Sequence, residues 1–334
     1  MSWNQTRLLV VSGFIAWMLI AANSSCVAAE SQDYSFKLGA DKSEYILGEP
    51  VTLAVYVTNL TTGKKVIRSN FNLVGDLELR VTYGNELSRR AKSFFRPAIY
   101  PHVPLELAPY QTGKRTQILL YTGENECGYL FDRPGVYTLA GKLEYYEGDS
   151  SSPSEIRIAP IQIKISEPDM RAKEAIANLW NKDGAYDFNR YQATAKTAEA
   201  FKTVAENYSD TPYAPYALYS IARMKMSPIE ATPESYLQAI ELLKRLIQNY
   251  PNSSLVEDSY YLIIVAYFRM EESDMAAKYG KEMREKFPDV VINRGADPLI
   301  KKFVQITSKQ PDQIKVNAVP PPEYPVPVPW EFRR

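Results

Sequence analysis

Cysteine and histidine are nearly absent from the sequence, which contains two cysteines and one histidine among its 334 residues. Zinc sites in proteins are built chiefly from several cysteine and histidine ligands, and a single imidazole, His102, cannot supply one. A Walker loop, the dinucleotide glycine fingerprint and the HExxH motif are also missing. We therefore predict no catalytic residue, no metal and no cofactor.

An excess of charge of one sign is missing as well, because 39 Lys and Arg residues balance 39 Asp and Glu residues. Nucleic-acid-binding proteins usually carry a basic excess, since they contact phosphates. We therefore expect no nucleic acid partner. Hydrophobic residues make up 45% of the chain, which is enough to fill real cores and argues against a disordered chain.

The one long apolar run is too short to span a membrane. Residues 8–22 form this run, whereas a bilayer span needs about 20 apolar residues. Arg7 precedes the run, and small residues follow it at the spacing of a secretory signal, which predicts cleavage after Ala29. We expect an exported protein of the periplasm or cell envelope, with no membrane span after cleavage.

Two alternatives to cleavage after Ala29 are an uncleaved anchor and a lipoprotein modified at Cys26. The sequence NSSC argues against the lipoprotein, because it lacks the apolar residue expected three places before such a cysteine. Cleavage after Ala29 leaves Cys127 as the remaining cysteine, so the exported chain could form no internal disulfide. Cys127 is interpreted as a small buried or loop residue.

Residues 30–167 show the period-two alternation of β-strands. In VTLAVYV (51–57), Val51, Leu53, Val55 and Val57 share one face, with turn residues GEP before them and NLTTG after them. Further alternating segments occupy residues 77–84, 116–122, 135–146 and 156–168. Short strands separated by turns, with no helical period between them, are typical of an antiparallel β-sandwich.

The segment LFDRPGVYTLAGKLEY (130–145) resembles the turn and strand of immunoglobulin-like domains in bacterial exported proteins. In those domains a tyrosine soon after a Pro-Gly turn can hold the turn, which implies this role for Tyr137. YILGEPVTLAVYVTN (45–59) resembles the second strand of the same domains, although the paired cysteines of antibody domains are missing. The resemblance implies an immunoglobulin-like β-sandwich over residues 30–167.

From residue 168 the apolar period becomes helical. TAEAFKTVAENY (197–208) and PESYLQAIELLKRLIQNY (233–250) each place their apolar residues on one stripe, as amphipathic helices do. Residues 169–188 and 297–308 are expected to be flanking helices. NKDGAYDFN (181–189) fails as a calcium loop, because Leu179 and Arg190 occupy its carboxylate positions, and it is interpreted as a turn.

The helical segments repeat. Tyr208-Ser209, Tyr250-Pro251 and Phe287-Pro288 each follow a helical stripe, at offsets of 42 and 37 residues. The aromatic residue is expected to end one helix, proline prevents its continuation, and a following Ser or Thr can cap the next helix. A repeat of this length indicates helix hairpins that bury their apolar stripes by stacking.

The repeat resembles the tetratricopeptide family, in the variant found in bacterial envelope proteins. The matching positions are Ala222, Ala239 and Pro251 in the first unit and Ile263, Tyr267, Ala276 and Pro288 in the second. Ile264 and Gly280 depart from the family pattern. The resemblance covers residues 190–290 and implies an all-α helical-hairpin solenoid over residues 168–309, with a concave groove that binds proteins.

Two sets of candidate partner-binding residues follow from these patterns. The first set is four tyrosines on the helices expected to line the groove: Tyr216, Tyr219, Tyr260 and Tyr261. The second lies in SRRAKSFFRPAIYPH (88–102), where basic and aromatic residues interleave: Arg89, Arg90, Phe95 and Arg96. Inter-helix packing is the alternative for the tyrosines. For 88–102 the alternatives are a solvated hairpin and a docking loop for an acidic protein or an anionic glycan.

We therefore expect a signal peptide (1–29), a sandwich domain (30–167), a solenoid (168–309) and a proline-rich extended tail (310–334). The tail is either a linker or docks on a partner through Trp330 and Phe332. The expected function is non-enzymatic: a scaffold of the cell envelope that binds envelope proteins or peptides. The alternatives are an enzyme or enzyme inhibitor acting through the sandwich, and a structural component of a surface layer.

Overall fold

A computed structural model of the chain describes residues 29–31, 33–69, 71, 76–91, 104–119, 129–179, 181–189, 193–227 and 231–287. Several predictions therefore fall outside the described residues. They concern the signal peptide up to residue 28, the helix at 297–308, the proline-rich tail, and the residues Cys26, Phe95, Arg96, His102, Cys127, Trp330 and Phe332.

The β part contains two sheets. The first is antiparallel and has four strands in the order β1 (Ala29–Glu30), β2 (Tyr34–Ala40), β4 (Val51–Asn59) and β9 (Thr112–Leu119). The second has the strand order β3 (Glu44–Ile46), β11 (Ser154–Ser166), β10 (Gly135–Glu147), β5 (Lys65–Arg68) and β8 (Pro104–Leu107). From β10 it also branches to β6 (Leu77–Tyr83), which pairs with β7 (Arg89–Ala91).

Side chains alternate between inside and outside along these strands, as the sequence pattern predicts. In β2, for example, Tyr34, Phe36 and Leu38 are buried, and Lys37 between them is exposed. The inward side chains of both sheets form one apolar cluster. That cluster gives the β part its own core, because burying apolar surface is the main source of folding free energy.

The second sheet is mixed, and this overturns part of the predicted fold class. β3 runs parallel to β11, with Glu44, Tyr45 and Ile46 opposite Lys164, Ile165 and Ser166. The prediction of an antiparallel immunoglobulin-like sandwich followed by an all-α solenoid is therefore wrong, and the fold is a mixed α/β arrangement. Alternation along a strand reports which face is buried and not the direction of the neighbouring strand, so sequence patterning could not show this.

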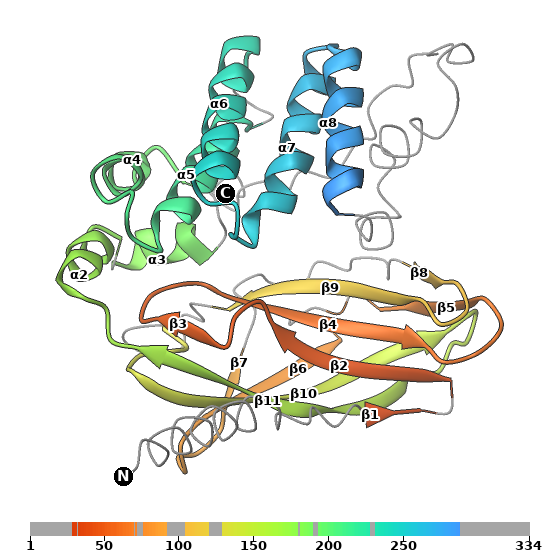
Figure 1. The fold of residues 1–334 in the computed structure, drawn as a ribbon. Helices are drawn as coiled ribbons and strands as arrows, with labels where there is room; N and C mark the ends of the chain where they lie inside the picture. The colour runs from red at the N-terminus through yellow and green to blue at the C-terminus, as the bar shows by residue number, and fades with distance from the viewer. Residues whose placement is uncertain are drawn as a thin grey trace, which may run out of the picture.

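Seven helices are described after the β part. They are α2 (Met170–Ala177), α3 (Lys182–Asn189), α4 (Ala198–Asn207), α5 (Ala214–Lys225), α6 (Pro233–Asn249), α7 (Leu255–Arg269) and α8 (Ser273–Lys286). From α4 to α8 each helix packs against the next, and α5 also contacts α3 and α7. Figure 1 shows the helices gathered on one side of the β part.

The helix ends bear out the repeated aromatic signal. Tyr208, Tyr250 and Phe287 are the C-caps of α4, α6 and α8. The expected hydroxyl caps after these aromatic residues are not made, because neither α5, whose N-cap is Tyr213, nor α7, whose N-cap is Ser254, has a side-chain cap. Thr232, which follows no such signal, caps α6 by accepting a hydrogen bond from the backbone N–H of Ser235.

The turn expected at 181–189 is instead the helix α3. Asn181 starts it, because its side-chain oxygen accepts a hydrogen bond from the backbone N–H of Gly184 at 2.9 Å. A Cβ at Gly184 would lie 2.6 Å from the carbonyl oxygen of Leu179. Glycine is therefore required here for a close approach of two backbone segments, which a sequence pattern reports only as a turn signal.

The helical core is not made by helices alone. Tyr129 from the β part belongs to the helical cluster of buried residues, and Ile46 at the end of β3 packs against the same cluster. The hydroxyl of Tyr213, the N-cap residue of α5, donates to the carbonyl oxygen of Leu47 at 2.7 Å. The helices therefore form a layer that packs on the β part. A free-standing solenoid does not describe them.

Candidate functional site

Three of the four candidate tyrosines lie inside the helical layer. Tyr216, Tyr219 and Tyr260 are 2%, 5% and 3% exposed, whereas Tyr261 is half-buried. The Tyr260 hydroxyl accepts a hydrogen bond from Lys286 at 2.7 Å, and its ring lies 6.1 Å from that of Phe287. Burial leaves these three side chains little surface for a partner, which agrees with the inter-helix packing alternative.

The two arginines of the second candidate set that the structure describes lie on β7. Arg89 pairs with Asp132, with 2.9 Å between the guanidinium nitrogen and the carboxylate oxygen. Arg90 is exposed and lies opposite Arg80 of β6. Phe95 and Arg96, the other two members of this set, are outside the described residues. Both arginines thus lie on one short strand, where consecutive side chains point to opposite faces of the sheet.

A second arginine braces the turn beside β7. One guanidinium nitrogen of Arg133, Nη2, donates to both carboxylate oxygens of Glu86, and the guanidinium carbon lies 4.2 Å from the centre of the Tyr83 ring. Hydrogen bonds between two charged groups are stronger than those between neutral groups. Gly135 has φ +146°, and a Cβ there would lie 2.3 Å from the Tyr83 ring, so glycine lets the two turns meet.

Tyr137 holds the Asp132–Gly135 turn, as the resemblance to immunoglobulin-like domains led us to expect. Its hydroxyl donates to the carbonyl oxygen of Arg133 at 2.8 Å. Burial raises the pKa of Tyr137 to about 12, so the hydroxyl keeps its proton and remains a donor. The predicted contact between Tyr137 and the turn is confirmed. It concerns one turn and does not make the fold an antiparallel immunoglobulin-like sandwich.

The most exposed large apolar side chain described is next to this network. Leu87 is 93% exposed and follows Glu86 in the β6–β7 connection, and Val136 nearby on β10 is 48% exposed. We call Glu86, Leu87, Arg89, Arg90 and Arg133 the Leu87 surface. It combines one projecting apolar side chain with arginines, two of which are fixed by carboxylates.

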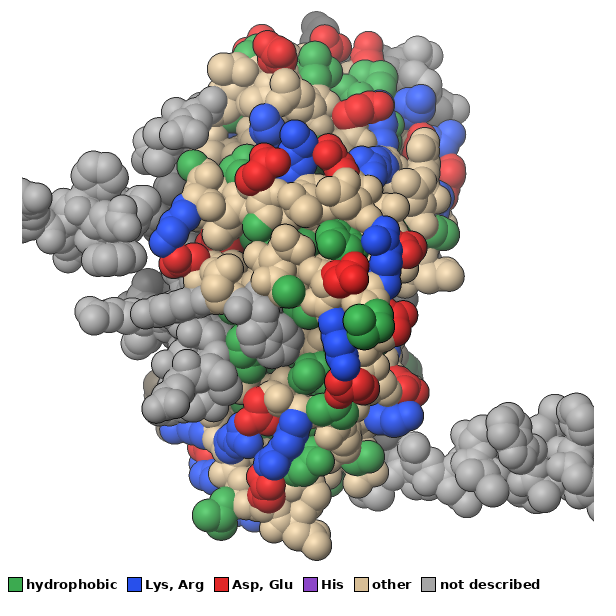
Figure 2. Space-filling model, turned by 90° about the vertical axis from the view of Figure 1, so that its left-hand side faces the viewer, with side chains coloured by type: hydrophobic (Ala, Val, Ile, Leu, Met, Phe, Trp, Pro, Cys, Tyr) green, Lys and Arg blue, Asp and Glu red, His purple; other side chains and the backbone are tan. Residues whose placement is uncertain are grey.

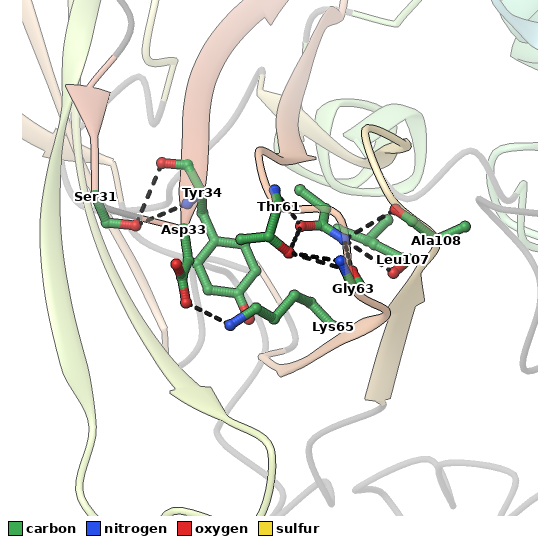
Figure 3. Close-up of polar contacts among 9 residues, drawn as sticks. Ser31, Asp33, Tyr34, Thr61, Gly63, Lys65, Leu107 and Ala108 are labelled. Carbon is green, nitrogen blue, oxygen red and sulfur yellow. Dashed lines mark hydrogen bonds and ion pairs between the residues drawn. The ribbon is translucent and has the colours of Figure 1, made fainter.

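Sequence patterning missed a cluster of hydrogen bonds around Asn59, which lies at the end of the β part opposite to the Leu87 surface. Asn59 is completely buried, and its amide nitrogen donates to the carbonyl oxygens of Gly63, Leu107 and Ala108 at 2.7, 3.3 and 2.9 Å. Its oxygen accepts from the backbone N–H and the hydroxyl of Thr61. Figure 3 shows these partners gathered at one point, where the β4–β5 loop meets the end of β8.

The same cluster presents two exposed apolar side chains. Leu60 and Tyr110 are 38% and 65% exposed, and Tyr110 has φ +58°, a left-handed conformation that is strained for an aromatic residue. Asp33 and Lys65 form an ion pair beside them, drawn in Figure 3. The NLTTG motif signalled only a turn, because the partners of Asn59 on β8 are distant in sequence.

Charge is evenly mixed on the face of the molecule drawn in Figure 2. Basic and acidic side chains are interspersed over the helices and the β part, and neither sign gathers into one patch. Among the described residues, no group of three or more His, Cys, Asp and Glu side chains could hold a metal ion. Within the same part of the chain, no helix is both long and apolar enough to cross a membrane.

No protein-family model and no curated protein matches the chain. The X-ray structure of the Northeast Structural Genomics Consortium target SoR45 shares 12% identity at a TM-score of 0.25, over 40% of this chain and 88% of that one. The β-glucosidase EmGH1 of Erythrobacter marinus shares 17% identity at a TM-score of 0.21, over 41% of this chain and 16% of the enzyme.

The alkylpurine DNA glycosylase AlkC of Pseudomonas fluorescens, bound to DNA with an abasic site analogue, gives 10% identity at a TM-score of 0.21. This match covers 45% of the chain and 33% of the glycosylase. At these TM-scores none of the likenesses supports a statement about fold or function. What the molecule does has to be argued from its own side chains.

Proposed function

We propose that the chain is a non-enzymatic, exported protein of the cell envelope that binds another protein through the Leu87 surface. The observation that carries the proposal is the 93% exposure of Leu87 on a connection whose neighbouring residue, Glu86, is held by Arg133. A leucine projecting from a fixed support costs little ordering entropy when a partner covers it.

The arginines specify the kind of partner. Arg90 is exposed, and Arg89 keeps 35% of its side chain exposed while paired with Asp132. Arginine is enriched at protein interfaces, and a carboxylate of a partner would suit its planar fork. We therefore expect a partner with an apolar pocket for Leu87 and an acidic side chain next to it.

Two sequence features support the proposed export to the cell envelope and the proposed role in protein binding. Residues 1–29 resemble a secretory signal. Residues 190–290 resemble tetratricopeptide repeats of bacterial envelope proteins, a family that acts in protein binding. Because three of its four candidate tyrosines are buried, the helical layer is proposed as the support of the molecule rather than as its contact surface.

Site-specific photo-cross-linking in envelope preparations tests the proposal. Leu87 is replaced by a photoreactive phenylalanine derivative, and matched proteins carry the same group at Leu237 on α6 or at Met170 on α2, which are 55% and 74% exposed. One defined protein adduct from position 87, and not from the two helical positions, is the expected result. The same adducts from all three positions, or an adduct from Leu237 alone, would contradict the Leu87 surface. An anionic glycan would give no protein adduct.

A further inference from the structure

Glu49 is a buried carboxyl group at the junction between the β part and the helices. It is 3% exposed and follows the turn of Ile46 to Gly48, where Gly48 has φ +88°. The backbone N–H of Glu49 donates to the carbonyl oxygen of Ile46 at 2.9 Å, which closes the turn. This turn aims the carboxyl group away from β4 and toward α5.

The carboxyl group joins three segments of the chain. One oxygen accepts from the backbone N–H of Ile46 at 3.1 Å. The other accepts from the Tyr216 hydroxyl of α5 at 3.2 Å and pairs with the ammonium group of Lys42 from the β2–β3 connection. Tyr213, the N-cap residue of α5, donates to the carbonyl oxygen of the neighbouring Leu47. The hydrogen bond from Tyr216 therefore links Glu49 to the helical layer, whereas Ile46 and Lys42 hold it within the β part.

Few other titratable groups face this carboxyl. Lys42 is 40% exposed, so solvent weakens its pairing. Tyr45, whose hydroxyl bonds Asp41, and Tyr213, which lies within electrostatic reach of Asp169, both have raised pKa values because of burial. Their hydroxyls therefore keep their protons over the range in which carboxyl groups titrate. Tyr216 likewise faces Glu49 as a hydroxyl donor.

We propose that Glu49 is a proton-sensitive latch between the β part and the helical layer, and that taking up a proton strengthens the attachment. This inference is independent of the proposed binding function. Burial raises the pKa of Glu49, and Lys42, the backbone N–H of Ile46 and Tyr216 offset this only in part. Lifting the helices away would remove Tyr216 and expose the Glu49 carboxyl group to water, and this loss of burial would lower its pKa.

The direction of the effect follows from linkage. A carboxyl group whose pKa is higher in the folded protein contributes its full stabilisation below its unfolded pKa and loses it as the pH rises through the folded pKa. Acidification from neutral pH therefore tightens the latch. Glu44 provides the opposite case, because hydrogen bonds from Ser166 and Lys164 lower its pKa, so its contribution is lost on acidification.

Thermal unfolding of the full chain from about pH 8 to about pH 5 tests the latch. The difference in Tm between wild type and Glu49→Gln should increase in favour of wild type as the pH falls. The difference between wild type and the matched control Glu44→Gln should stay nearly constant over this range, because a carboxyl group with a lowered pKa loses its contribution only at lower pH. A wild-type minus Glu49→Gln difference that is as constant with pH as that of the Glu44 control overturns the proposal.

Lys42→Met supplies a second variant that does not depend on the folding of Glu49→Gln. Lys42 is partly exposed, and among the described residues it is the cation that pairs with Glu49, so its replacement removes this pairing. The stabilisation on acidification should then begin at a higher pH than in wild type. An unchanged pH profile in Lys42→Met would also overturn the proposal, because Glu49 would then not be titrating at this junction.

Discussion

Tyr213 and Leu47 are 166 residues apart in the sequence and are joined by a hydrogen bond of 2.7 Å from the tyrosine hydroxyl to the leucine carbonyl. The bond connects α5 to the turn between β3 and β4. Together with the contact between Tyr216 and Glu49, it links the helical layer to the β part by a polar contact. These polar links add to the apolar contacts that Tyr129 and Ile46 make with the helical cluster.

The first prediction concerns this bond. Tyr213→Phe keeps the ring, which is fully buried, and removes the donor from the Leu47 carbonyl oxygen. The free energy of unfolding should fall by about 1 to 1.5 kcal/mol, measured by denaturant titration. Tyr236→Phe, at a half-buried tyrosine on α6, is the matched control and should change it by less. Equal effects of the two changes would contradict the importance of the Tyr213 bond.

The second prediction concerns Asn59. Asn59→Ala removes the donor shared by the carbonyl oxygens of Gly63, Leu107 and Ala108, and the Leu107 oxygen then lacks this donor in a buried site. We expect a loss on the order of 2 to 3 kcal/mol in the free energy of unfolding, because unsatisfied buried acceptors are costly. Asn252→Ala, at an exposed position between α6 and α7, should be nearly neutral. A neutral Asn59→Ala would mean that the β4–β5 loop does not depend on this amide.

The third prediction compares two glycines. Gly184→Ala places a Cβ 2.6 Å from the backbone oxygen of Leu179, so α3 must shift and the protein should lose about 1 to 3 kcal/mol. Gly63→Ala meets nothing within 4 Å and should have little effect. Thermal unfolding of both variants decides the point. Similar Tm values for the two would show that α3 and the segment before it do not approach as closely as described.

The sequence predicted local features well. The ends of α4, α6 and α8 follow from Tyr208, Tyr250 and Phe287, because an aromatic residue and a helix breaker act over a few residues. The contact of Tyr137 with the turn before it is local in the same way. Each of these features depends on residues that are close in the chain.

The sequence failed where the outcome depends on distant partners. The three-residue strand β3 gave no sign that it would pair in parallel with β11, which begins more than 100 residues later. The helical stripes of α4 and α6 were visible, but not that Tyr216 of α5 would face Glu49 of the β part. The role of Glu49 was hidden for the same reason, since GEP marks only a turn.

The fourth prediction concerns the charges of the Leu87 surface. Arg90→Glu reverses an exposed charge that has no role in the Arg133–Glu86 or Arg89–Asp132 pairs. The association rate with the partner identified at position 87 should fall and its salt dependence should weaken, because exposed charges act mainly on encounter. Arg157→Glu, an exposed arginine on β11, is the matched control. Equal rates for the two variants would exclude the acidic partner surface.

The affinity of the identified partner for Leu87→Ser tests the central claim most directly. Calorimetric titration should show a loss of at least about tenfold in Kd for Leu87→Ser, as expected when a central apolar anchor worth more than about 1.4 kcal/mol is removed. Leu237→Ser, which changes an exposed leucine of the helical layer, should bind like wild type. The Tm of both variants should stay at the wild-type value. Unchanged affinity of Leu87→Ser, or a larger loss for Leu237→Ser, would contradict binding through the Leu87 surface.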